Sequence, residues 1–341
     1  MTRSKNQSKF ETVFEIVDDY IKSGLIPCAV LGYVDSNKNT FFSSSGLRQI
    51  YPKKKPVNTE TKFDLASLTK VLFTTHQVLK ACSINKLALD DPISKYIPDL
   101  CQYNIHDAWE RKITLKQCLS HSTPFPAVEP FYTYSSNSNN LKNYILQNRW
   151  KKHKPVYSDI NFIFLGIILE RIFRKSIKNI ETGYGFNFKP KRINIAATEK
   201  CFWRNRLICG ETHDENSFAL GGAGHAGLFG SINDILEFAY DMLVGRNITN
   251  NHLECIKKKL YKNRSCGWEV SNKGWSGGNL CSNETIGHTG FTGTGIWIDF
   301  KNKIAWTLLT NRVHPSRHNN SKIEELRVRV GEKMIEVFSR R

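Results

Sequence analysis

The chain has 341 residues, with 49 Lys and Arg against 31 Asp and Glu and a formal net charge of +18. This length can bury a large core in one domain or two apposed subdomains, so stability needs neither a disulfide nor a metal. The nine cysteines are scattered, odd in number and free of any Cys-x-x-Cys pair. That pattern argues against a disulfide framework and a zinc site, and it indicates a reducing compartment.

The basic residues are spread out, with only short runs such as 53–55 and 257–259, and no nucleic-acid-binding motif accompanies them. They predict a solvated basic surface that is compatible with an anionic small substrate. The N-terminus lacks the apolar core of a signal peptide, and the longest apolar stretch falls short of the ~20 residues that span a bilayer. We therefore expect a cytoplasmic protein with no membrane or nucleic-acid partner. The sequence does not define an oligomeric state.

The N-terminal part predicts a helix followed by a hairpin. Apolar residues at helical spacing over 9–23 predict a helix that ends at Gly24. Residues 26–34 and 40–44 are rich in β-forming side chains and flank a turn at 35–39. They predict two antiparallel strands.

Residues 63–82 predict the helix around which we expect the chain to be organised. An apolar stripe at spacings of three and four follows Asp64, a suitable N-cap, so the helix should begin near Ser67. Ser67 and Lys70 then face the same side of its first turn, with the serine oxygen near the positive end of the helix dipole. The pair is a credible nucleophile and base. Because Ser-x-x-Lys also recurs by chance, partners elsewhere must support it.

The middle of the chain predicts two helices separated by loops. Residues 113–121 predict a helix, and the polar, proline-containing tract 122–143 predicts loop for most of its length. A second polar set, Tyr157-Ser158-Asp159, comes directly before an apolar helix over 160–172. We expect this set to lie at a helix start, and the tract 122–143 to border a cleft.

A glycine-rich segment at 210–230 leads into the C-terminal part of the chain. It contains His213 and His225, which either line a site or have structural or surface roles. Ser231 and Asp234 have the spacing of a capping box and open a helix. Four strands and a last helix are predicted at residues 267–271, 284–288, 293–300, 304–311 and 323–338. The two chain ends should therefore build one antiparallel sheet.

A third polar set, His288-Thr289-Gly290, stands at the glycine-rich edge of a predicted strand. Taken in order with Ser67-x-x-Lys70 and the set at 157–159, it resembles the serine β-lactamase and penicillin-binding protein superfamily, in its class C and esterase-like branch. The resemblance covers nearly the whole chain and includes residues 63–71, 87–92, 119–122, 156–166 and 287–299. Residues 195–229 resemble a narrower group, the N-acetylmuramyl-L-alanine amidase-like proteins that act in cell-wall recycling.

The resemblance implies an α+β protein with the β-lactamase-like fold. An antiparallel sheet built from both chain ends would be flanked by helices, beside an all-helical subdomain. The chain would be a single domain over residues 1–341. The helical subdomain, approximately residues 75–225, would be inserted between the N- and C-terminal parts of the sheet.

The resemblance also implies a role for each motif residue. Ser67 would be the acylated nucleophile, Lys70 the base and Tyr157 the phenol that relays protons. Backbone N–H groups of Ser67 and Phe291 would form the oxyanion hole. Lysine can act as a base only if its pKa is lowered, and we expect His288 and the helix start to do this.

Four further residues would contact the substrate. Asp159, which stands where the family often has asparagine, would touch the substrate amide, and His288 and Thr289 would flank the Tyr157 oxygen beside Gly290. Many relatives carry lysine in place of His288, so the charge there should titrate near neutral pH in this chain. No metal or cofactor is implied.

These residues predict a serine hydrolase that acts on an amide or ester through an acyl-serine intermediate. The foremost substrate is a muropeptide, which makes the chain a cell-wall amidase or peptidase. The alternatives are an esterase or a class C-type β-lactamase, and, outside the enzymes, an inactive relative that binds muropeptides.

Overall fold

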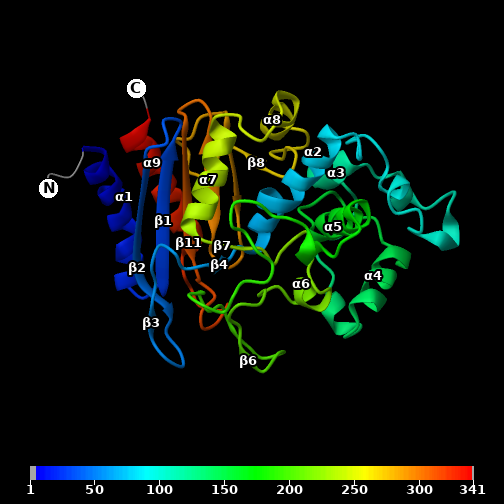
Figure 1. Ribbon diagram of the computed structural model, residues 1–341, viewed down its shortest axis with the longest axis horizontal. Helices are drawn as coiled ribbons and strands as arrows, with labels where there is room; N and C mark the ends of the chain where they lie inside the picture. Colours follow the sequence, from blue (N-terminus) through cyan, green and yellow to red (C-terminus); the bar gives the residue numbers. More distant parts are fainter. Residues whose placement is uncertain (1–4, 340–341) are drawn as a thin grey trace.

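The computed structural model describes residues 5–339, which form a seven-stranded antiparallel sheet with helices on both faces and a helical region beside it (Figure 1). The strand order is β3-β2-β1-β11-β10-β9-β8. These strands are β1 (Cys28–Asp35), β2 (Thr40–Gln49), β3 (Lys55–Pro56), β8 (Glu269–Val270), β9 (Thr285–Thr289), β10 (Gly295–Asp299) and β11 (Ile304–Thr310). Since β1 pairs with β11, the expectation that both chain ends build one antiparallel sheet is confirmed.

Helices cover both faces of this sheet. They are α1 (Lys5–Lys22) and α9 (Ile323–Phe338) on one face and α7 (Ile232–Leu243) on the other (Figure 1). Along β1, Ala29 and Leu31 pack in the core under α1 and α9, whereas Val30 and Val34 belong to the core on the α7 side. This alternation is the period-two pattern of a strand that is buried on both faces.

The remaining helices lie to one side of the sheet, where Figure 1 shows α2 to α6 grouped together. They are α2 (His76–Ser83), α3 (Leu115–Leu119), α4 (Ser138–Gln147), α5 (Asp159–Phe173) and α6 (Glu215–Ala219), and α8 (Asn250–Lys257) lies near the top of the sheet. The apolar side chains of α5 are almost all buried, as expected for the central helix of this region. The boundaries of a helical subdomain at about 75 and 225 stay a prediction.

The segment that carries Ser67 departs from a regular helix. It follows β4 (Phe63–Asp64), which pairs with β7 (Phe229–Gly230), and runs through a 3₁₀ turn (Ala66–Leu68) and a π-helical turn (Lys70–Thr75) into α2. Leu65, rather than Asp64, takes the N-cap position. The predicted N-cap is therefore wrong, because the tight turn at Ala66 leaves the Asp64 carboxylate bonded to the Ala66 N–H instead of to the next turn of helix.

Most of the other predicted elements are present with altered ends. The helix predicted at 113–121 is shorter (α3), and the strand predicted at 267–271 is reduced to the two residues of β8. The tract 122–143, predicted as loop for most of its length, contains no α-helix or strand before Ser138, where Asn137 caps α4 with its side-chain oxygen. Helices α6 and α8 were not predicted, because each is short and lies in a segment rich in polar residues or glycine.

Cys255 and Cys266 form a disulfide across a loop, with their Cα atoms 5.9 Å apart. The expectation of a chain without disulfides is therefore wrong for this pair. The return of the loop after α8 brings the two residues together, a proximity that a sequence separation of 11 does not reveal. The other seven cysteines are free. Among helices in residues 5–339, none combines the length and apolar character needed to cross a membrane.

Gly166 in α5 is the point at which this helix touches the glycine-rich segment. A Cβ atom there would lie 2.7 Å from the Gly224 nitrogen, so Gly166→Ala must push the two backbones apart. We expect a loss of about 1 to 3 kcal/mol in the free energy of unfolding, although alanine is the better helix former by about 1 kcal/mol. Chemical denaturation followed by circular dichroism measures the change.

Asn143→Ala, at an exposed position of α4, is the matched control and should leave the free energy of unfolding within about 0.5 kcal/mol of its original value. A Gly166→Ala protein as stable as this control would contradict the close packing of α5 on Gly224.

Candidate active site

Ser67 is presented to solvent by a strained turn. Its neighbour Ala66 has a φ of +46°, a left-handed conformation that costs a non-glycine residue roughly 1 to 2 kcal/mol. Asp64 supports this turn because its two carboxylate oxygens accept the backbone N–H groups of Ala66 at 2.8 Å and of His213 at 2.6 Å. Burial raises the pKa of Asp64, and the two N–H donors oppose that effect. The turn leaves Ser67 partly exposed between buried neighbours.

The loop after β9 is bound tightly to the same turn. The Thr292 hydroxyl donates to the Asp64 carbonyl at 2.7 Å, and the Thr294 hydroxyl donates to the Leu65 carbonyl at 3.1 Å. A Cβ atom at Gly290 would lie 2.6 Å from the Leu65 oxygen, so only glycine permits this approach. Within residues 5–339, the N–H groups of Ser67 and Phe291 have no protein acceptor. Two free donors therefore stand on adjacent segments, as an oxyanion hole requires.

Lys70 lies fully buried beneath Ser67. Its Nζ atom is 3.0 Å from Ser67 Oγ, 3.0 Å from the His225 carbonyl oxygen and 2.8 Å from Asp159 Oδ1. Burial alone would lower the pKa of Lys70, but the neighbouring Asp159 and Tyr157 oxygens raise it above its ordinary value. The expectation that Lys70 has a lowered pKa is therefore wrong. The carboxylate at position 159 offsets the cost of burying the ammonium.

A second carboxylate lies near the same ammonium. Asp214 Oδ1 is 2.8 Å from His225 Nε2, and one ligand atom each from Asp159, Asp214 and His225 lie within 4.8 Å of one another. Burial would raise the pKa of Asp214, but the neighbouring His225 lowers it below the ordinary range. This is the one such cluster in the described part of the chain. Because Lys70 already brings a positive charge to Asp159, the donor set does not fit a resident metal ion.

Tyr157 stands at the end of the loop before α5, among aromatic and cationic side chains. The Lys70 Nζ atom is 5.1 Å from its ring centroid, and the Arg264 guanidinium carbon is 5.2 Å away. Its ring also lies 4.4 Å from the His121 ring and 5.9 Å from the His288 ring. The structure therefore brings Ser67, Lys70 and Tyr157 together, with Asp159 and His288 beside them.

His288 is a buried neutral imidazole. Its Nδ1 atom is 2.9 Å from the Thr289 carbonyl oxygen, to which it donates as Nδ1–H. Burial lowers the pKa of His288 well below its ordinary value, and the charges of Arg264 and Lys70 lower it further. The expectation that this residue carries a charge titrating near neutral pH is therefore wrong, as is the expectation that it lowers the pKa of Lys70.

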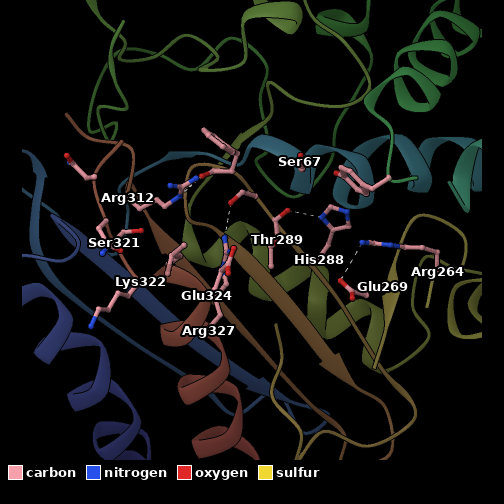
Figure 2. Close-up of a pocket in the computed structure, with 16 residues that line it drawn as sticks. Ser67, Arg264, Glu269, His288, Thr289, Arg312, Ser321, Lys322, Glu324 and Arg327 are labelled. Atoms are coloured by element: carbon pink, nitrogen blue, oxygen red, sulfur yellow. Dashed lines mark hydrogen bonds and ion pairs between the residues drawn. The ribbon is translucent and has the colours of Figure 1, made fainter. Parts of the chain in front are cut away.

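A pocket of about 610 Å³ opens from Ser67 along the loop after β9 toward the start of α9. Figure 2 shows Arg264, Arg312, Lys322 and Arg327 around it, with Glu269 and Glu324 as the acidic residues. Arg327 is buried and donates to the carbonyls of Gly290 at 2.9 Å and Thr294 at 2.8 Å. Burial lowers its pKa to about 9. Such a cationic lining favours an anionic substrate group.

His213 and His225, which the sequence left unassigned, both support the site. His213 stacks on Phe291 at 5.7 Å between ring centroids and bonds to Glu199, with Nε2 and Oε2 3.0 Å apart. His225 holds Lys70 through its backbone oxygen. Sequence reasoning missed Arg264, Arg312 and Arg327, since no motif or fixed spacing marks them. His121 lies within residues 119–122, which share the family resemblance, but no motif assigns it a role.

With this geometry in place, the class of protein is defined: the family model described as Beta-lactamase matches residues 13–329, and the chain belongs to that family. It is a serine hydrolase acting on an amide or ester.

Two curated relatives and one solved structure illustrate the likeness. A protein of Escherichia coli K12 named "Putative D-alanyl-D-alanine carboxypeptidase" is 32% identical over 308 residues, covering 75% of this chain and 70% of the relative. The N-acetylmuramyl-L-alanine amidase of Bacillus subtilis 168 is 28% identical over 369 residues, covering 92% and 83%. A solved class C β-lactamase is 17% identical with a TM-score of 0.75 and coverage of 97% of both chains, a likeness of fold alone.

We expect Ser67 to be the residue that reacts with serine-directed reagents, since it is partly exposed, lines the pocket and lies beside a buried amine and two free N–H donors. Incubation with a fluorophosphonate should add a single adduct, measured by intact-mass spectrometry. The adduct should be absent from Ser67→Ala and present in Ser122→Ala, a change of another partly exposed serine. Labelling that persists in Ser67→Ala would falsify the assignment.

We expect Asp159→Asn to move the pH dependence of this labelling to lower pH. Removing the carboxylate lowers the pKa of Lys70, so the Lys70–Tyr157 pair loses a proton more readily. For two charges 2.8 Å apart in a partly exposed site, a shift of about one pH unit is reasonable. The labelling rate measured between pH 5 and 10 gives the midpoint. An unchanged midpoint would show that Asp159 does not control this proton.

Proposed function

We propose that this serine hydrolase cleaves an amide bond in a peptidoglycan-derived peptide that carries a carboxylate, and so acts as a muropeptide amidase or peptidase. The cationic pocket that opens directly from Ser67 is the observation that carries the proposal. The names of the two curated relatives, a carboxypeptidase and an amidase, support the same substrate class.

The pocket offers a carboxylate two well-placed guanidinium groups. Arg312 donates through Nε to the Phe291 carbonyl at 2.9 Å, and its guanidinium lies 4.6 Å from the Phe291 ring, so it is held at the rim of the site. Arg327 lies deeper, and its Nε atom has no partner among the described residues. Charge-assisted hydrogen bonds from arginine to a carboxylate are among the stronger ones in proteins. A peptide with a free carboxyl group would bind at Arg312, and buried Arg327 would add positive charge beneath it.

In the proposed mechanism, Ser67 Oγ attacks the scissile carbonyl carbon while its proton passes to the Lys70–Tyr157 pair. Because Asp159 keeps Lys70 as an ammonium, Tyr157 is the member of the pair that takes the proton. The N–H groups of Ser67 and Phe291 bind the oxyanion, worth about 3 to 4 kcal/mol per donor. Tyr157 then protonates the leaving amine, and water releases the acyl group by the reverse route.

The other site residues would hold the substrate in place. Asp159 would accept a hydrogen bond from the substrate amide with the part of its carboxylate that Lys70 leaves exposed. Thr289 and Gly290 would place the substrate backbone along the edge of β9, close to Ser67. Buried His288 would fix the end of that strand through its bond to the Thr289 carbonyl.

The alternatives are an esterase or a class C-type β-lactamase, and a binding protein without activity. The intact arrangement of Ser67, Lys70 and Tyr157 argues against the binding protein, and the cationic pocket favours a charged peptide over a simple ester. Cytoplasmic recycling of cell-wall fragments is the setting that this substrate class suggests. The Cys255–Cys266 disulfide is instead typical of oxidising compartments, so the location stays a prediction.

We expect N-acetylmuramyl-L-alanyl peptides or peptides ending in D-alanyl-D-alanine to be cleaved, with kcat/KM of at least ~10⁴ M⁻¹s⁻¹, the range of ordinary enzymes. Mass spectrometry of the products identifies the bond that is cut. Arg312→Gln should raise KM roughly tenfold for the free acid, and should not change KM for the same peptide with an amidated C-terminus.

Ser67→Ala is the inactive control in this assay. If both peptide classes stay intact while cephalosporins or short esters turn over efficiently, the muropeptide assignment must be given up and one of the alternative hydrolases adopted.

A further inference from the structure

Tyr157 is surrounded by groups from five parts of the chain. Lys70 approaches from the π-helical turn, His121 from the end of α3, Asp159 from α5, His288 from β9 and Arg264 from the loop before β8. The negative charge of Asp159 is already directed at Lys70, 2.8 Å away. The electrostatic environment of the Tyr157 oxygen therefore depends on which of the remaining groups are charged.

Neither imidazole in this set is charged. His121 accepts the Ser158 N–H on Nδ1 at 3.0 Å, so its proton is on Nε2, and burial lowers its pKa well below the ordinary value. His288 is likewise buried with a lowered pKa. The second positive charge next to Tyr157, besides Lys70, is therefore the guanidinium of Arg264.

Arg264 is held in place by a rigid loop. The Gly267 N–H donates to the Leu119 carbonyl at 3.0 Å, and the Cys255–Cys266 disulfide fixes the chain two residues beyond Arg264. Its acidic neighbour Glu269 has a carboxylate oxygen 3.7 Å from the guanidinium and lies below it in the view of Figure 2, with His288 above. The side chain is only 20% exposed, so its charge is weakly screened.

We propose that Arg264 is a positioning residue for the proton transfer. Its positive charge stabilises the negatively charged Tyr157 oxygen that accepts the Ser67 proton, and so supplies the cation that His288 does not. The inference rests on the acyl-serine mechanism of the proposed function, and it does not depend on the muropeptide as substrate.

The step that tests this inference is the phosphonylation of Ser67 by a neutral fluorophosphonate. The Ser67 Oγ–H proton moves to the Tyr157 oxygen, an Oγ–P bond forms, the P–F bond breaks and fluoride leaves. The reagent carries no carboxylate. Its rate therefore reports the proton transfer and is insensitive to anion binding in the pocket.

The experiment measures the second-order rate of Ser67 labelling between pH 5 and 10 in matched variants. Arg264→Gln should move the midpoint of the acid limb up by about one pH unit and lower the rate about tenfold at pH 7, the shift expected for one charge lost at this distance. Arg264→Lys, which keeps the charge, should stay within about 0.3 units of the original midpoint. Adding His288→Lys to Arg264→Gln should bring the midpoint back down.

The control is Arg246→Gln. Arg246 also lies over a tyrosine ring, 5.4 Å from the Tyr240 ring centroid, and has an acidic partner in Asp241 at 3.5 Å, but it does not line the pocket that contains Ser67. It should leave the midpoint unchanged. The inference is overturned if Arg264→Gln keeps the original midpoint, if Arg246→Gln shifts it equally, or if His288→Lys gives no recovery. If Arg264→Gln alters only KM for carboxylate substrates, Arg264 is a substrate-binding residue and the inference fails.

Failure of the substrate assignment gives a different result. A protein that leaves muropeptides intact but shows these midpoint shifts loses the proposed substrate and keeps the inference about Arg264. A protein whose Ser67 is not labelled at all overturns both the acyl-serine mechanism and this inference.

Discussion

The buried ammonium of Lys70 is the constraint on which the rest of the site depends. A charged group with no exposed surface is stable only if polar partners replace its water, and here Ser67, the His225 carbonyl and Asp159 do so from three different segments. Each partner must lie within hydrogen-bonding distance of the Lys70 Nζ atom. The glycine contact between α5 and residue 224, and the π-helical turn that carries Lys70, both serve this placement.

Such a cluster is a poor source of stability, because the cost of desolvating the charges cancels much of their attraction. Because the cluster lies directly beneath the partly exposed Ser67, a role in the chemistry explains it better. The strained conformation of Ala66 points the same way, since a non-glycine residue keeps a positive φ only where the surroundings enforce it. Three side-chain bonds enforce it here, from Asp64, Thr292 and Thr294.

The sequence predicted most of the fold and the three motif sets, because these depend on local patterns. The apolar run of α5, the capping box of Ser231 with Asp234 and the apolar, β-forming residues of the C-terminal strands are all short-range signals. What it could not predict arises from contacts between distant segments. The π-helical turn after Ser67 and the disulfide of Cys255 are examples.

The charges of His288 and Lys70 were likewise not predictable from the sequence. From the sequence, His288 was expected to titrate near neutral pH and Lys70 to have a lowered pKa, as the residue types and their order suggested. Both expectations failed for one physical reason: a pKa is set by burial and by the nearest charges, and those come from Asp159 and Arg264. A motif identifies an ionisable group, whereas the surroundings of that group in the folded protein determine its charge.

The residues inside the sequence motifs and the pocket residues outside them contribute differently to the function. Ser67, Lys70 and Tyr157 lie on the elements that the family resemblance covers, so they support the type of reaction. Arg312 and Arg327 come from beyond β11 and from α9, and Arg264 comes from the loop before β8; all three lie outside the motifs. Family membership therefore supports the acyl-serine chemistry more strongly than it supports any substrate, because a shared fold carries many specificities. The choice of substrate has to be argued from the charges that Arg312 and Arg327 bring to the pocket beside Ser67, whereas the proposed role of Arg264 is in the proton transfer.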